Sequence, residues 1–148
     1  MRTTLNDVHS QLNATEVADV RRPMSLTDLC GDVKEMRASG REISVAGGRH
    51  AMGGQQFRRD SIHFDMTALD CVLGEDSECG LLHIEAGAMW PRIIEATHAM
   101  TGNWAIHQKQ TGVDAVTLGG SISANAHGRG LAIQPLGNDI EDLTLINA

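Results

Sequence analysis

Apolar residues recur at helical spacing between Ser25 and Gly40, at the positions Leu26, Leu29, Cys30, Val33 and Met36. Ser25 is a favourable N-cap because its hydroxyl can accept from the first free N–H groups of a helix. Gly40 is typical of the residue that ends one, since glycine readily adopts the left-handed conformation. The pattern therefore predicts a helix that begins after Ser25 and ends at Gly40.

Two short strands are predicted after this helix. Ile43–Ala46 is a compact apolar stretch, and in 61–66 the apolar residues alternate with His63 and Asp65. The alternation predicts a strand with one buried and one polar face. Residues 1–22 are polar and mixed, and we expect an arm or a short helix there.

The second half of the chain continues the alternation of strands and helices. We expect a turn over 74–80, a strand over 81–86, a helix from Pro91 to about Gly102, and a short strand over 104–106. A short helix over 120–127 would point the N–H groups of its first turn at a ligand. The last residues, 143–148, read as a buried strand. Together these elements predict an α+β or α/β domain.

Glycines gather directly after the strand Ile43–Ala46, in the sequence GGRHAMGG. Glycine lets a ligand approach the main chain, and free N–H groups at the end of a strand can bind a phosphate. A Gly-rich hairpin turn is the structural alternative. Gly48 and Gly53 have the spacing of a Walker loop, but the required Lys and Ser or Thr do not follow, which argues against an NTPase. The pattern G-x-G-x-x-G is also absent from this loop.

A second cluster of small residues, VTLGGSISANAHG, runs from Val116 to Gly128. Two such loops could close on one extended anionic ligand, such as the pyrophosphate of a dinucleotide.

With these two clusters in view, the chain resembles the FAD-binding domain of the vanillyl-alcohol oxidase and para-cresol methylhydroxylase (PCMH-type) flavoproteins. The matching blocks are Ala46–Gly54, Leu82–Trp90, Val116–Gly130 and Pro135–Ile140. The resemblance implies an α+β fold with a small βαβ subdomain packed on a larger subdomain of mostly antiparallel strands with helices. It implies a boundary between an arm, 1–22, and the FAD-binding domain, 23–148. Because the family's chains continue into a substrate-binding cap, we expect this sequence to be an N-terminal portion that lacks the cap.

The resemblance also implies which residues contact FAD. They are Gly47, Gly48, Arg49, His50, Ala51, Met52 and Gly53 in the first cluster, and Val116, Thr117, Gly119, Gly120, Ala124, Asn125, His127 and Gly128 in the second. In some members a histidine at the position of His50 is bonded covalently to the flavin, whereas other members bind it non-covalently, and both remain open here. For the glycines of the second cluster, close packing of a helix on a strand is an alternative role. No catalytic base is assigned.

Composition narrows the possible partners. The 148 residues carry a formal charge of −7 with a pI near 5.4, and no basic face indicates nucleic acid. No apolar run is long enough to span a membrane, and the three cysteines lack C-x-x-C spacing, which favours a cytoplasmic setting without a metal site. An apolar surface left open by the missing region would favour a homodimer.

Three functions remain open at this stage. The first is the FAD-binding portion of an oxidase or dehydrogenase that accepts a hydride from a small organic substrate at flavin N5. The second is an NADPH-dependent reductase of the same fold, like the UDP-acetylenolpyruvoylglucosamine reductases, against which His50 counts. The third is a non-catalytic FAD-binding fragment.

Overall fold

The computed structural model describes residues 2–147 and divides the chain into two compact units. The first unit extends to Leu69 and includes the residues from Leu145 onward, and the second is Asp70–Thr144. Each unit has its own core and is described by itself.

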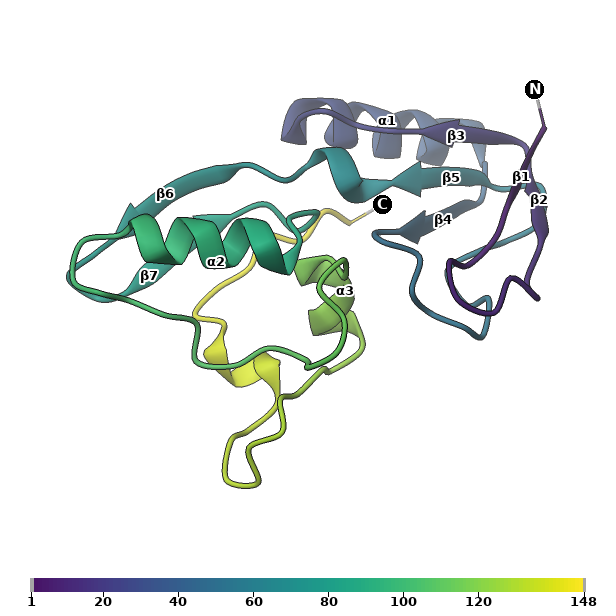
Figure 1. Ribbon diagram of the computed structural model, residues 1–148. Coiled ribbons are helices and arrows are strands. Elements are labelled where there is room, and N and C mark those ends of the chain that lie inside the picture. Colours follow the sequence, from purple (N-terminus) through teal and green to yellow (C-terminus); the bar gives the residue numbers. More distant parts are fainter. Residues whose placement is uncertain (1, 148) are drawn as a thin grey trace. The chain divides into compact units, whose positions relative to one another are not determined.

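A three-stranded parallel sheet forms the centre of the first unit, in the order β3–β5–β4 (Figure 1). Its strands are β3 (Asp19–Arg21), β4 (Ile43–Ala46) and β5 (Ile62–Asp65). An antiparallel pair, β1 (Thr3–Leu5) and β2 (Thr15–Val17), precedes the sheet. The expectation of an arm or short helix for residues 1–22 is therefore wrong for the part that the structure describes. Strands of three residues are too short to show a hydrophobic period.

Helix α1 (Leu26–Ser39) connects β3 to β4, and its predicted ends are confirmed. The Ser25 hydroxyl accepts from the N–H of Asp28 at 3.1 Å, and Gly40 ends the helix with φ +63°. The buried residues Val33 and Met36 pack on the sheet as part of the first core, with Ile62 and Phe64.

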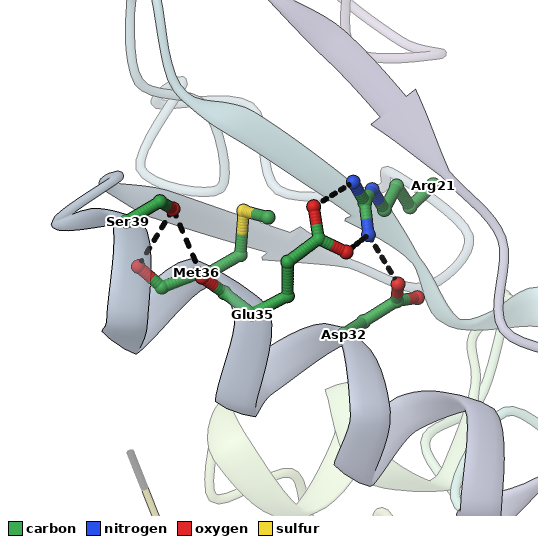
Figure 2. A network of polar contacts seen from close by, with 5 residues as sticks. All are labelled: Arg21, Asp32, Glu35, Met36 and Ser39. Carbon is green, nitrogen blue, oxygen red and sulfur yellow. Dashed lines mark hydrogen bonds and ion pairs between the residues drawn. The ribbon is translucent and has the colours of Figure 1, made fainter.

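An arginine from β3 also binds this helix. Figure 2 shows the Arg21 guanidinium between two carboxylates of α1. Its Nη1 lies 2.5 Å from Asp32 Oδ1 and 2.6 Å from Glu35 Oε2, and its Nη2 lies 2.8 Å from Glu35 Oε1. The β3–α1–β4 unit, which is the predicted small βαβ subdomain, is thus held by apolar packing and by charge.

Strand β5 is confirmed in position, but the prediction of a half-buried strand is wrong. Ile62, His63 and Phe64 are all buried, with His63 2% exposed. The reason is that β5 is the central strand, and the face that carries His63 is also covered. Phe57 contributes to this cover, with its ring centroid 5.5 Å from that of His63.

The second unit contains a hairpin and two helices. The hairpin pairs β6 (Val72–Asp76) with β7 (Leu81–Ile84), and the helices are α2 (Trp90–Ala99) and α3 (Leu118–Ser123). Two 3₁₀ turns complete the elements, η1 (Met66–Ala68) in the first unit and η2 (Leu136–Asp139) in the second. The core of the second unit consists of Ala88, Trp90, Ile93 and Leu136.

Three predictions for residues after Asp70 are corrected, one for a turn and two for strands. The turn predicted over 74–80 is shorter, because β6 continues to Asp76. Residues 104–106 are not a strand, since the Trp104 indole instead packs on the turn and donates to the carbonyl of Ser77 at 2.8 Å. Residues 143–147 form no strand because no described segment pairs with them; Leu143 is 63% exposed and Leu145 72%. Ala148 lies outside the described residues.

Candidate functional site

The first Gly-rich loop leaves the sheet at the carboxyl end of β4, where ligands of parallel sheets commonly bind. Within residues 2–147, the backbone N–H groups of Gly48, Ala51 and Gly53 donate to no other described group. Unbonded N–H groups in an exposed loop are the donors that a phosphate requires. The predicted anion-binding character of this loop is therefore consistent with its hydrogen bonding.

Arg49 adds a positive charge to the same loop. Its side chain is exposed, and its backbone adopts φ +56°, a left-handed conformation that non-glycine residues seldom occupy. The carbonyl oxygens of this loop are held by other segments. Arg49 O accepts from the N–H of Val8 at 3.1 Å, and Ala51 O accepts from Gln56 Nε2 at 2.8 Å. Two carbonyl groups of the loop are thus bonded within the protein, while the N–H groups of Gly48, Ala51 and Gly53 donate to no other described group.

His50 lies in this loop beside a second imidazole. Its Nδ1 is 2.7 Å from Nε2 of His9, and the ring centroids are 4.7 Å apart. His9 was not among the predicted site residues. No motif could have revealed it, because the two residues are far apart in the sequence and the pairing depends on the β1–β2 hairpin.

The second cluster contains α3, and here one prediction is wrong. The first N–H groups of this helix do not face a ligand, because those of Leu118 and Gly119 donate to Ala88 O and Ala86 O, each at 2.8 Å. The N–H of Gly120 donates to the Thr117 hydroxyl at 3.1 Å. The helix start is therefore closed by its own unit.

Close packing explains Gly119. A Cβ at this position would lie 3.1 Å from Ala86 O and 3.2 Å from Ala86 Cβ. The close packing expected of Gly119 is present, but its neighbour Ala86 follows β7 and is not part of a strand. The neighbouring Ser121 is 1% exposed, and its hydroxyl has no hydrogen-bond partner among the described residues. A buried hydroxyl without a partner is unusual, and no motif in the sequence points to this serine.

The remaining predicted residues of this cluster follow α3. A cavity of about 410 Å³ is lined by two segments, Gln110–Thr111 and Ala124–Arg129. The second segment includes the predicted residues Ala124, Asn125, His127 and Gly128. His127 is exposed and its Nδ1 lies 2.8 Å from the carbonyl oxygen of Gly128. Gly128 donates its N–H to Gln108 Oε1 at 3.1 Å and packs on the backbone of Lys109. A flavin role for these residues stays a prediction.

A family model described as "FAD binding domain" matches residues 17–148. The chain belongs to this family of FAD-binding domains. The resemblance that the sequence predicts is therefore confirmed, and so are the PCMH-type α+β fold and FAD as the cofactor. The match begins at Val17, so it includes β3 and the whole parallel sheet but not the loop between β1 and β2.

Curated relatives of this FAD-binding domain include the L-gulono-1,4-lactone dehydrogenases of two Mycobacterium tuberculosis strains. Each is 26% identical over 131 residues, which cover 86% of this chain and 29% of the relative. The chain thus spans less than a third of the length of these relatives.

Solved structures show the same fold. An alkyldihydroxyacetonephosphate synthase has a TM-score of 0.66 at 20% identity and covers 77% of this chain and 21% of its own. The cholesterol oxidase from B. sterolicum has a TM-score of 0.64 at 16% identity, and the match covers 86% of this chain and 24% of the oxidase. The grass pollen allergen Phl p 4, described as having glucose dehydrogenase activity, has a TM-score of 0.64 at 16% identity. The match covers 76% of this chain and 24% of the allergen.

The residues of the first loop suit the cofactor of the family. FAD carries a diphosphate, and the loop offers unbonded N–H donors together with the Arg49 guanidinium. Among residues 2–147, no group of three or more His, Cys, Asp or Glu side chains is placed to hold a metal ion. No helix in the described part of the chain is long and apolar enough to cross a membrane.

Proposed function

We propose that this chain is the FAD-binding part of a flavin-dependent oxidase or dehydrogenase that oxidises a small organic substrate. The observation that carries the proposal is the loop after β4, where the N–H groups of Gly48, Ala51 and Gly53 donate to no other described group, in a chain that belongs to an FAD-binding family. The curated relatives are dehydrogenases named for a lactone, which supports an oxidoreductase acting on a small molecule rather than a simple FAD carrier.

Within this proposal, the chain's own residues bind and orient the cofactor. The N–H groups of Gly48, Ala51 and Gly53 hold the diphosphate, and Arg49 balances its charge. His50 either bonds covalently to the flavin or packs against it without a bond. FAD supplies the hydride-accepting chemistry when it is bound. No residue of this chain is assigned to the substrate, whose oxidised C–H bond lies next to an alcohol or amine.

The test is a denaturing gel of the purified chain viewed for flavin fluorescence, together with the visible spectrum of the native protein and a titration with FAD. A fluorescent band that disappears in His50→Ala but persists in His98→Ala would establish His50 as the covalent attachment site. His98 is a suitable control because it is an exposed histidine outside the Gly-rich loop, in the last turn of α2.

The other outcomes are equally distinct. A yellow native protein whose gel band does not fluoresce supports non-covalent FAD. Rapid bleaching of the yellow colour by NADPH would favour the function of an NADPH-dependent reductase over that of an oxidase. A chain that remains colourless and does not bind added FAD contradicts cofactor binding by this chain.

A further inference from the structure

The loop between β1 and β2, Asn6–Asn13, is built around a buried carboxylate. Asp7 is 1% exposed and accepts from the N–H groups of His9 at 3.0 Å and Ser10 at 2.6 Å. It also accepts from the Ser10 hydroxyl and from Asn13 Nδ2, each at 2.8 Å. The bond from Asn13 contributes most to holding the pKa of Asp7 far below its usual range. An ionised carboxylate with this many donors fixes the shape of a short loop.

The same loop is bonded to the Gly-rich loop at two carbonyl groups. Val8 N–H donates to Arg49 O at 3.1 Å, and Asn13 Nδ2 donates to Met52 O at 2.7 Å. Asn13 therefore connects the carboxylate of Asp7 directly to the Gly-rich loop. Because these carbonyl groups are drawn toward Asn6–Asn13, the peptide planes that contain them have fixed orientations.

A third contact joins the side chains of the two loops. His9 Nε2 lies 2.7 Å from His50 Nδ1, with the rings inclined at 57°. One imidazole donates its N–H and the other accepts it, so the contact requires that at least one ring be neutral. It fixes the orientation of the His50 imidazole in the Gly-rich loop.

Two backbone features of the Gly-rich loop lie next to these contacts. Arg49 has φ +56°, which a non-glycine residue adopts only when its surroundings hold it there. Gly54 has φ +72°, and a Cβ on it would lie 3.0 Å from Asn13 Oδ1. The two loops are thus in close contact and not merely neighbours.

We propose that Asn6–Asn13 is a positioning element of the cofactor site, in which Asn13 and His9 hold the Gly-rich loop in the conformation that binds the diphosphate of FAD. This inference rests on the proposed function. It assigns a role to a segment outside the residues that the family model matches, which begin at Val17. Asn13 and His9 act through Met52 and His50 and are positioning residues.

The experiment compares Asn13→Ala, His9→Ala and His9→Gln with the unaltered 148-residue chain. Leu12→Ala is the matched control, because Leu12 belongs to the same loop and is 86% exposed. Amide hydrogen exchange in 47–54 is measured without FAD, and FAD affinity is measured by titration. We expect exchange about tenfold faster and FAD binding about fivefold to tenfold weaker in the two alanine variants. Glutamine retains an N–H donor near the position of Nε2. In His9→Gln, both the exchange rate in 47–54 and the FAD affinity should therefore be close to those of the unaltered chain.

Each result has a defined meaning. Faster exchange together with weaker FAD binding, and neither change in Leu12→Ala, supports the inference. Faster exchange with unchanged FAD affinity overturns it, as does unchanged exchange in both alanine variants. If the unaltered chain binds no FAD, the proposed function fails and this inference fails with it, while the exchange data still report whether the loops are joined. Urea unfolding of each variant shows whether a general loss of stability accounts for the result.

Discussion

The Nδ1 atom of His63 lies 2.9 Å from the hydroxyl oxygen of Ser44, which in turn lies 2.8 Å from the hydroxyl oxygen of Ser61. Ser61 donates its only O–H to the carbonyl oxygen of Arg58 at 2.8 Å. Ser44 must therefore donate to Ser61 and accept from His63, which places the proton of the neutral imidazole on Nδ1. The three side chains are all buried and form a polar layer on one face of the parallel sheet.

This arrangement predicts that stability falls below neutral pH. Burial lowers the pKa of His63, a lowering to which Arg49 adds and which Asp65 opposes. The unfolded chain takes up a proton on this residue near pH 6.5, whereas the folded chain does so only at lower pH. Stability from His63 is therefore complete above about pH 7 and is lost as the pH falls through about 6.5.

Urea unfolding between pH 5 and pH 8 measures this effect. His63→Asn retains an N–H donor close to the position of Nδ1 and cannot titrate, so its unfolding free energy should depend less on pH than that of the unaltered chain. His98→Asn, which removes an exposed histidine, should keep the original dependence. Parallel curves for the unaltered chain and His63→Asn would contradict the prediction.

The fold was predictable from sequence where local signals agree. Helix α1 has a capping serine, an apolar period and a terminal glycine, and each acts within a few residues. The location of β5 was also predictable, but its burial was not, because His63 is polar by type and buried only through partners on other segments. Strands β1 to β3 are defined by pairing with distant residues, for which three-residue stretches carry no signal.

The candidate site shows the same division. The Gly-rich loop was predictable because glycine and the strand before it are local features. The role of Gly119 was not decided by its type, since both a ligand and a carbonyl group such as Ala86 O require a residue without a side chain. The supporting loop Asn6–Asn13 was missed because its contacts join segments about 40 residues apart.

The Arg21 network predicts a stabilising link between β3 and α1. Arg21→Ala should lower the melting temperature, because it leaves Asp32 and Glu35 without their shared cation (Figure 2). It also lowers the pKa of Glu35, so the stabilisation is present above the usual range of a glutamate and is lost as the pH falls into it.

A matched control separates this network from an ordinary surface pair. Arg58 and Glu42 also form an arginine–carboxylate pair, but their side chains are 59% and 60% exposed. Arg58→Ala should therefore change the melting temperature less than Arg21→Ala, because exposed pairs are weakened by solvent. Equal changes in the two variants, measured by thermal unfolding at pH 7, would show that the Arg21 network is no more than a surface pair.

Gly119 predicts a packing effect that can be measured without FAD. Gly119→Ala places a methyl group against Ala86 and should reduce stability by about 1–2 kcal/mol, because the contact with backbone atoms cannot easily relax. Gly137→Ala is the control, since a Cβ there meets no atom within 4 Å. Urea unfolding of both variants tests this, and an unchanged stability in Gly119→Ala would assign the glycine to the ligand alone.

The turn of the β6–β7 hairpin requires a glycine at position 80, for both backbone and steric reasons. Gly80 has φ +71°, and a Cβ on it would lie 2.6 Å from Cζ3 of Trp104. Gly80→Ala therefore combines backbone strain with displacement of the indole, and should destabilise the protein by about 2–3 kcal/mol. Urea unfolding gives this loss, and tryptophan fluorescence should shift because the Trp104 ring moves away from the turn.

Gly112→Ala separates the two causes. Gly112 has φ +93°, but a Cβ there would meet no atom within 4 Å, so its replacement introduces strain without a steric clash. We expect it to cost about 1 kcal/mol and to leave tryptophan fluorescence unchanged. If Gly80→Ala and Gly112→Ala lose the same stability, strain alone explains both and the contact with Trp104 contributes nothing. A larger loss in Gly80→Ala, with the fluorescence shift, assigns the difference to the indole packed on Gly80.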